Sequence, residues 1–201
     1  MLLHALIRAS RANGPGLRAV VFFQGCTLHC RACWNAKSHP FGGSDMTVDA
    51  VAHEVRQAHP EHSLEGVTFS GGEPMQQADS LLRLIQCLRR QAAELSFGLF
   101  SGYAEHELDQ GQYWIWGDHS SEQHRKCLWD EIRARLDFAI LGRFNQAQPS
   151  RLPLRTSRNQ VLQLFSYRYS PADFSEQMTE VSIKEGGQVE VTGFPTLGLP
   201  W

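Results

Sequence analysis

Strand-like and helix-like segments alternate through most of this 201-residue chain, and the alternation limits the folds open to it. Residues 18–25 (RAVVFFQG) are rich in β-branched and aromatic side chains and end at a glycine, as a buried strand does. The ranges expected to be strands are 18–25, 64–70, 96–102, 136–142 and 159–165. Helices are expected over 47–59, 77–93 and 121–136, with Thr47 capping the first and Pro60 beyond its end.

This order predicts an α/β fold with a mainly parallel sheet, because strands joined through helices form right-handed βαβ units. Ligands of such sheets gather at the carboxyl ends of the strands. Four glycine-bearing loops, QGC, SGGEP, FSGY and LGRFN, each follow an expected strand. We therefore expect them on one rim, which is the active face. The tail, residues 180–194, alternates around Gly186–Gly187 and predicts a β-hairpin.

Composition and charge suit a single globular domain over residues 1–201, with 42% hydrophobic residues and a formal net charge of -2. No overall basic field favours nucleic acid as a partner. The first sixteen residues lack the apolar run and cleavage site of a signal peptide. No stretch approaches the roughly 20 apolar residues that a membrane-spanning helix needs. We expect a cytoplasmic protein that binds neither membrane nor nucleic acid.

Three of the five cysteines, Cys26, Cys30 and Cys33, follow the first strand in the pattern CxxxCxxC. In a reducing compartment, clustered thiols are more often metal ligands than disulfide partners. Three cysteines leave one iron of a four-iron cluster without a protein ligand, and an open iron binds a substrate or cofactor. The alternative is a zinc site that recruits His29 or His39 as its fourth ligand.

The other two cysteines, Cys87 and Cys127, lie within expected helices and are interpreted as buried structural thiols. The loop SGGEP (70–74) offers a second chemical element. Its two glycines, Gly71 and Gly72, let backbone groups approach a ligand closely, and Glu73 adds an acceptor. The loop is expected beside the cysteine loop on the same rim.

Together, CxxxCxxC after a first strand and GGEP after the second resemble the radical S-adenosylmethionine (SAM) superfamily. More narrowly, NGPGLRAVVFFQGCTLHCRACWN resembles the opening of glycyl-radical-enzyme activases. CWN, GVTFSGGEP, FSGY and LGRFNQ resemble activating proteins of anaerobic (class III) ribonucleotide reductase, and VTGFP (191–195) resembles related activases. The resemblance covers about residues 13–165, which we take as the core, with 166–201 as a C-terminal extension.

The resemblance implies a partial (β/α)6 barrel of the radical SAM type with a C-terminal β-hairpin tail. It implies two cofactors, a [4Fe–4S] cluster with one open iron and SAM. Reductive cleavage of SAM would give a 5′-deoxyadenosyl radical that takes a hydrogen from a glycine of a partner enzyme. The implied partners are a glycyl radical enzyme and a flavodoxin or ferredoxin-type electron donor.

Residue by residue, the resemblance assigns Cys26, Cys30 and Cys33 as cluster ligands and Gly71, Gly72 and Glu73 as contacts of the SAM methionine group. Ala32 and Trp34 flank the last cysteine, where the family often touches adenine. Many members have an aromatic residue at the position of Ala32. In this chain either the Ala32 backbone makes the contact or Trp34 covers the ring, and Trp34 has core packing as its alternative.

Four further polar residues and one aromatic segment have open interpretations. Arg18, of the GPG-x-R string, either orients the cluster loop or docks a partner, or is a solvated strand-end arginine. Arg143 either meets a carboxylate on the active rim or has an ordinary surface role. Asn159 and Gln160 resemble a polar pair of these activases, within a different preceding turn. The aromatic segment 109–120 is a lid, a docking surface or a locally packed insertion.

Three functions compete at this point. The first is an activase that installs a glycyl radical on a large partner. The second is a radical SAM enzyme that acts on a small molecule or peptide, similar to deazaguanine-forming synthases. The third is a non-catalytic iron–sulfur or zinc protein, and SGGEP beside the cysteine loop counts against it because a carrier needs no SAM loop.

Overall fold

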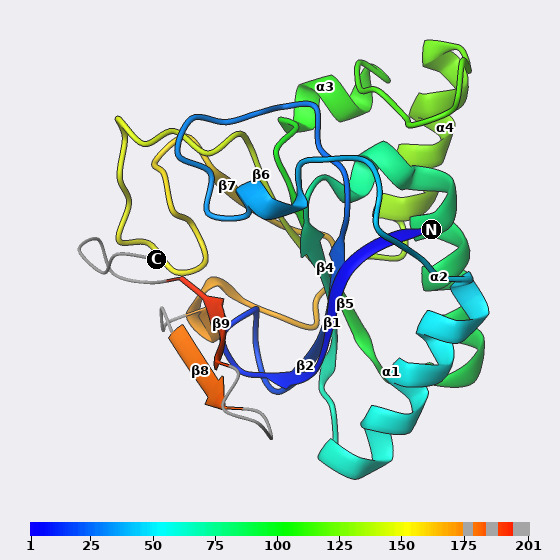
Figure 1. Ribbon diagram of the computed structural model, residues 1–201, viewed down its shortest axis with the longest axis vertical. Coiled ribbons are helices and arrows are strands. Elements are labelled where there is room, and N and C mark those ends of the chain that lie inside the picture. Colours follow the sequence, from blue (N-terminus) through cyan, green and yellow to red (C-terminus); the bar gives the residue numbers. More distant parts are fainter. Residues whose placement is uncertain (175–178, 184–188, 195–201) are drawn as a thin grey trace.

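A seven-stranded sheet with helices on one face forms the body of the protein (Figure 1). The computed structural model describes residues 1–174, 179–183 and 189–194. The strands follow the order β3-β1-β2-β4-β5-β6-β7. The four central strands are parallel: β2 (Arg18–Phe23), β4 (Gly66–Gly71), β5 (Ser96–Ser101) and β6 (Phe138–Leu141). These four confirm the predicted parallel core, and their carboxyl ends lie at one edge.

The outer strands are antiparallel and differ from the prediction. β1 (Leu2–Ser10) pairs with β2, and β3 (Ser44–Asp45) pairs with β1. β7 (Val161–Leu164) was expected within a mainly parallel sheet, but it runs antiparallel to β6 because residues 142–160 form no crossover helix. The described residues thus form a mixed sheet with β3 and β7 at its edges. They show an α/β fold and no closed barrel.

Three longer helices cover one face of this sheet: α1 (Val48–His62), α2 (Ala78–Gln91) and α4 (Glu122–Arg133). The Thr47 hydroxyl accepts from the N–H of Ala50 at 3.1 Å, so the predicted cap is confirmed. The predicted end of α1 is wrong. The helix continues through Pro60 to His62, because a proline in the last turn removes only one helical hydrogen bond.

Short helical turns complete the connections. They are η1 (Ala36–Ser38), η2 (Pro74–Gln77), α3 (Glu105–Asp109) and η3 (Pro171–Phe174). Cys87 is buried on α2, as predicted, whereas Cys127 lies exposed on α4. The prediction for Cys127 is wrong because its position on α4 turns away from the sheet, unlike neighbouring Leu128. No helix among the described residues has the length and apolar character to span a membrane.

The predicted C-terminal hairpin is present as two paired strands, β8 (Thr179–Ile183) and β9 (Val189–Gly193), with Val181 opposite Val191. Gly186–Gly187 lie outside the described residues. The hairpin lies on the opposite side of the sheet from the helices (Figure 1). Glu180 joins it to the end of β1, because its carboxylate accepts from the Ser10 hydroxyl and from the N–H of Arg11 at 2.8 Å.

Candidate functional site

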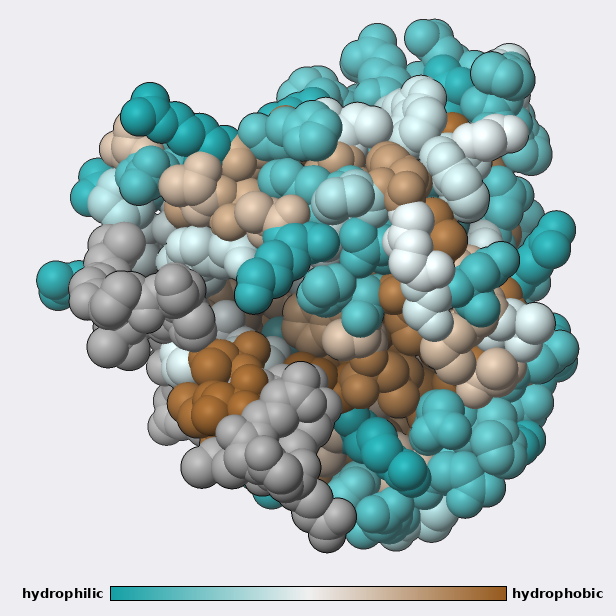
Figure 2. Space-filling view, in the orientation of Figure 1, coloured by the Kyte–Doolittle hydropathy of each residue, from teal (hydrophilic) through white to brown (hydrophobic). Residues whose placement is uncertain are grey.

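A cavity of about 250 Å³ lies where the carboxyl ends of the parallel strands meet the hairpin. Figure 2 shows this side of the molecule, with a hollow near its centre and hydrophobic residues gathered below it. The four predicted glycine loops all contribute to the cavity wall. Seven of the eight predicted site residues line it: Cys26, Cys30, Cys33, Trp34, Gly71, Gly72 and Glu73.

The cysteine loop is held in shape by backbone hydrogen bonds to its own far end. The N–H of Gly25 donates to Ser38 at 2.7 Å, and the N–H of Cys26 donates to the carbonyl of His39 at 2.9 Å. Cys33 donates to the carbonyl of Cys30 at 3.1 Å, which closes a turn between the last two cysteines. These bonds fold the chain back on itself, so that three thiols face one cavity.

The glycines of the SGGEP loop are required by a close approach of two backbones. A Cβ on Gly71, whose φ is +105°, would stand 2.5 Å from the backbone nitrogen and oxygen of Phe23. One on Gly72 would stand 2.4 Å from the carbonyl oxygen of Gly25. The N–H of Gly72 instead donates to Phe23 at 2.8 Å. Contact of these glycines with a ligand stays a prediction, and the structure shows that they join two loops.

Glu73 is buried, with 1% of its surface exposed, and lines the cavity. Its carboxylate accepts from the N–H of Met75 at 2.9 Å, the hydroxyl of Ser101 at 2.9 Å and the N–H of Gly102 at 2.7 Å. Burial raises the pKa of Glu73 to about 7, although these three donors act in the opposite direction. The carboxylate is therefore fixed in orientation by η2 and by the loop after β5.

The two residues expected near adenine lie in different places. Trp34 lines the cavity with 36% of its surface exposed, and its ring packs against Phe144 with centroids 5.8 Å apart. Core packing of Trp34 is therefore wrong. Ala32 is exposed, has a left-handed φ of +58°, and is not part of the cavity wall. The turn between Cys30 and Cys33 directs Ala32 away from the cavity.

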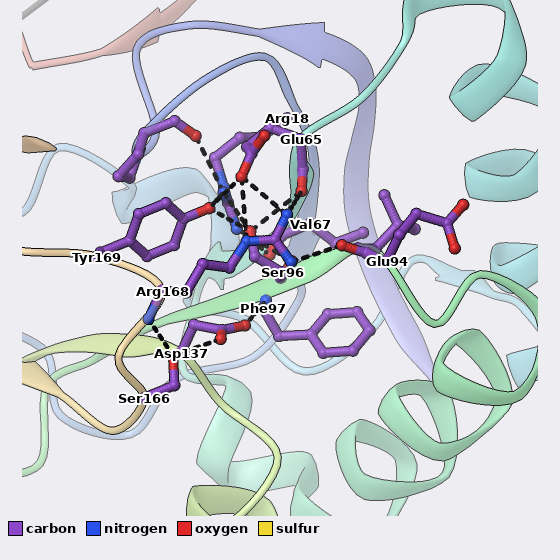
Figure 3. Close-up of polar contacts among 12 residues, drawn as sticks. Arg18, Glu65, Val67, Glu94, Ser96, Phe97, Asp137, Ser166, Arg168 and Tyr169 are labelled. Atoms are coloured by element: carbon purple, nitrogen blue, oxygen red, sulfur yellow. Dashed lines mark hydrogen bonds and ion pairs between the residues drawn. The ribbon is translucent and has the colours of Figure 1, made fainter.

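Arg18 lies within a buried group of polar side chains (Figure 3). Its side chain is fully buried at the amino end of β2, so the solvated alternative is wrong. The guanidinium donates to Thr68 at 2.8 Å, to Val67 at 3.0 Å and to the hydroxyl and carbonyl of Ser96 at 2.8 and 3.2 Å. The six residues of β2, roughly 20 Å of strand, separate it from the cysteine loop. Arg18 joins the amino ends of three strands.

The C-terminal segment completes this group of polar residues. The Tyr169 hydroxyl bonds Ser96 at 2.6 Å and Glu65 at 2.8 Å, and Arg168 contacts the same Glu65 carboxylate at 2.9 Å. Asp137 accepts from Ser166 and from the N–H of Phe97 (Figure 3). Residues 166–169 therefore cross the amino ends of the strands, opposite the edge that carries the cysteines.

The remaining polar candidates have structural partners. Arg143 meets a carboxylate, as one interpretation expected: it donates to Glu107 through two bonds of 2.7 and 2.9 Å. Gln160 lines the cavity and donates to the carbonyl of Gly142 at 3.2 Å, whereas Asn159 donates to Arg143 and does not line it. Asn159 and Gln160 thus also hold the loop after β6.

The aromatic segment 109–120 is partly core and partly surface. Tyr113 and Ile115 are buried, at 3% and 4% exposure. Trp114 and Trp116 are exposed at 43% and 48%, and both rings pack against Phe41 of the cysteine loop. From residue 111 to residue 116, odd positions are buried and even positions are exposed, so this part of the segment is a locally packed insertion with an exposed aromatic face.

Comparison with known proteins adds a family to this geometry. Residues 12–163 match the family described as "4Fe-4S single cluster domain". The chain belongs to this family. A relative named "Anaerobic ribonucleoside-triphosphate reductase-activating protein", from Haemophilus influenzae, is 30% identical over 76% of this chain and 91% of its own length. A protein of the same name from Vibrio cholerae is 26% identical over 77% and 92%.

A "Pyruvate formate-lyase-activating enzyme" from Clostridium pasteurianum is 32% identical over 52% of this chain and 46% of its own length. With these relatives, the chain is a radical SAM enzyme of the glycyl-radical activase type, and its cofactors are a [4Fe–4S] cluster and SAM. The resemblance seen in the sequence is thereby confirmed.

The donor set of the cavity fits a 4Fe–4S single-cluster protein. Burial, with a contribution from the Glu73 charge, raises the pKa of the Cys26 thiol to about 11, and burial also raises that of Cys33. Buried thiols of this kind become thiolates when a metal compensates the charge. No three His, Cys, Asp or Glu side chains among the described residues converge tightly on a single ion. Three thiolates that each bind a different iron of one cluster do not need to converge on a single ion.

Sequence analysis missed the cavity wall opposite the cysteines. Thr192 and Phe194, at the end of the hairpin, line the cavity, as do Asn13 and Phe100. The Phe194 and Phe100 rings have centroids 5.7 Å apart, and Asn13 donates to the Thr192 hydroxyl at 3.0 Å. The NGPG and VTGFP strings were visible in the sequence, but nothing in it brings residues 13 and 192 together.

Proposed function

We propose that this protein cleaves SAM reductively at a cluster held by Cys26, Cys30 and Cys33, and thereby installs a glycyl radical on a partner enzyme. One observation carries the proposal: the N–H of Glu73 donates to the carbonyl of Gly25 at 2.9 Å, which joins the SGGEP loop to the cysteine loop at one cavity. When bound, the cluster supplies the electron for SAM cleavage and an open iron for its amino and carboxylate groups.

The protein groups position and shield the cofactors. Glu73, held by three donors, presents a fixed carboxylate to the SAM amine. Gly71 and Gly72 allow the two loops to approach each other. Trp34 takes the adenine contact, because Ala32 lies outside the cavity wall. Phe144 supports the Trp34 ring from the loop after β6.

The partner in this proposal is a glycyl radical enzyme such as anaerobic ribonucleotide reductase, and the electron donor is a flavodoxin or ferredoxin-type protein. The relatives' names support this choice, and the Haemophilus relative matches over nearly its whole length. The five free cysteines suit a cytoplasmic location. The same proposal takes residues 1–201 as one radical SAM domain whose core is a partial (β/α)6 barrel.

The test has two stages. After anaerobic reconstitution, dithionite and SAM should give 5′-deoxyadenosine with wild-type protein, whereas Cys30→Ala should lose both the cluster and the product. Cys127→Ala, at an exposed cysteine outside the cavity, is the matched control and should retain both. Incubation with an anaerobic ribonucleotide reductase should then give the doublet signal of a glycyl radical in electron paramagnetic resonance. A Cys30→Ala protein with normal iron and sulfide would contradict the ligand assignment.

Failure at the second stage alone has a different meaning. SAM cleavage without a glycyl radical on any glycyl radical enzyme would support a radical SAM enzyme with a small-molecule or peptide substrate. One equivalent of zinc and no sulfide after reconstitution would contradict radical chemistry altogether.

A further inference from the structure

The two loops that form the mouth of the cavity carry an unusual excess of positive charge. Residues 24–43 contain Arg31 and Lys37, and residues 143–160 contain four arginines. These two segments hold six of the 19 Lys and Arg residues of the chain and none of its 21 Asp and Glu residues. The chain as a whole has a net charge of -2, so the positive charge is local to this face.

The two loops form one surface. The Trp34 and Phe144 rings join them, and both loops line the same cavity. In Figure 1 the loop with η1 and the loop after β6 lie at the same end of the sheet. We call residues 24–43 and 143–160 together the basic mouth.

Most of these cations have no counter-charge within the chain. Arg143 pairs with Glu107 at 2.7 Å. The other five make no ion pair within the part of the chain that the structure describes: Arg31, Lys37, Arg151, Arg155 and Arg158. None of the five lines the cavity. They lie on the two loops that line the cavity, so a molecule that they attract contacts these loops rather than the interior of the cavity.

We propose that the basic mouth is the docking surface for an acidic one-electron carrier protein. This inference rests on the proposed function, which requires an electron from outside. Arg31 and Ala32, between Cys30 and Cys33, are both exposed. A carrier seated there is separated from the cluster by one turn of chain, and electron transfer falls steeply with distance. The carrier loses one electron and the cluster gains it; no bond forms or breaks and no proton moves.

Charge complementarity selects the occupant. Unpaired cations around a docking site attract an acidic partner and speed its association, and added salt weakens that attraction. The exposed aromatic rings of Trp114 and Trp116, which pack on Phe41 of the cysteine loop, supply apolar contact area beside the cations. Interfaces between proteins are enriched in tryptophan and arginine.

The test uses the reconstituted full-length protein and a reduced, acidic plant-type [2Fe–2S] ferredoxin as probe. The double variant Lys37→Glu/Arg151→Glu changes one exposed side chain in each loop and leaves the cysteine turn intact. Its matched control is Arg83→Glu/Lys126→Glu, the same charge change on α2 and α4. Stopped-flow absorbance measures the rate of cluster reduction, and calorimetry measures the affinity for oxidised ferredoxin.

At low salt, the mouth variant should be reduced at least about tenfold more slowly than wild type and should bind ferredoxin correspondingly more weakly. The reduction rate of the control should stay within about twofold of the wild-type rate. Added salt should lower the reduction rate of wild type more than that of the mouth variant. Equal losses in both double variants, or no loss in either, would overturn the proposal. Tighter binding of a dT20 oligonucleotide than of ferredoxin, lost in the mouth variant alone, would assign the surface to nucleic acid and also overturn it.

Dithionite separates this inference from the proposed function. Wild type and the mouth variant should cleave SAM equally with dithionite, since that small reductant needs no docking surface. If wild type fails to cleave SAM with dithionite, the proposed function fails. If cleavage with dithionite is normal and ferredoxin reduces both proteins equally, only the docking inference fails.

Discussion

The N–H of Glu73 and the carbonyl of Gly25 stand 2.9 Å apart and join two loops that leave neighbouring strands. This bond holds the buried residue Glu73 beside Gly25, the residue that precedes Cys26. It depends on Gly71 and Gly72, where a Cβ would meet backbone atoms at 2.5 Å or less. Because backbone atoms cannot rotate away as a flexible side chain can, any side chain there separates the loops.

Gly71→Ala is therefore expected to lower the cluster content of reconstituted protein severely, measured as iron and sulfide per chain. Gly43→Ala is the matched control: its φ of +101° is close to the +105° of Gly71, but no heavy atom lies within 4 Å of an added Cβ. The control carries the same backbone strain, of order 1 kcal/mol, without the clash. Equal loss of cluster in both variants would show that strain, rather than contact between the loops, determines the effect.

Glu73→Gln tests the carboxylate itself. Both carboxylate oxygens now accept hydrogen bonds, one of them from the N–H of Gly102 at 2.7 Å. The substitution replaces one of these oxygens with an NH2 group that cannot accept, and it removes the negative charge facing the cavity. We expect cluster content to remain and affinity for SAM to fall about tenfold or more, because a charge-assisted hydrogen bond contributes roughly 1.5–3 kcal/mol. Equilibrium dialysis with labelled SAM measures the change, at a pH above the pKa of about 7 so that Glu73 is ionised. Glu54→Gln, partly exposed on α1 and outside the cavity wall, should bind SAM as wild type does.

Arg18→Met tests the polar group at the opposite edge of the sheet. It leaves Thr68, Val67 and Ser96 without their buried donor, so we expect a loss of about 3–5 kcal/mol in the free energy of unfolding. Urea denaturation of the apoprotein measures it. Arg168→Met, in the same group but partly exposed, should cost about 1 kcal/mol or less. Native stability of Arg18→Met with loss of ferredoxin reduction would instead favour a docking role for Arg18.

Arg18 also shows where sequence reasoning reaches its limit. The GPG-x-R string marked the residue, but its environment comes from Glu65, Ser96 and Tyr169, which are distant in sequence. Local patterns predicted the four parallel strands and the cysteine loop because β-branched runs and glycine turns act over a few residues. They did not predict β1 or the direction of β7. These two strands pair with the outermost parallel strands, β2 and β6, and that pairing depends on contacts between segments distant in sequence.

The same limit applies within the site. The spacing CxxxCxxC and the SGGEP loop predicted which side chains would share a cavity, since both follow strands that lie side by side. The hairpin wall could not be predicted, because Thr192 meets Asn13 across 179 residues. The position of Ala32 depends on its own left-handed backbone conformation, at φ +58°, which the local amino-acid composition does not predict.

Trp34 and Ala32 therefore give the sharpest test of the adenine contact. Stacking of a base on an aromatic ring contributes about 1–3 kcal/mol, so Trp34→Ala should weaken SAM binding about tenfold. Ala32→Gly should leave SAM affinity unchanged, because Ala32 lies outside the cavity and glycine adopts its left-handed backbone without strain. Trp114→Ala removes a ring of similar exposure, 43% against 36%, that does not line the cavity, and should also bind SAM normally. Weaker SAM binding by Ala32→Gly with normal binding by Trp34→Ala would return the adenine contact to the Ala32 backbone.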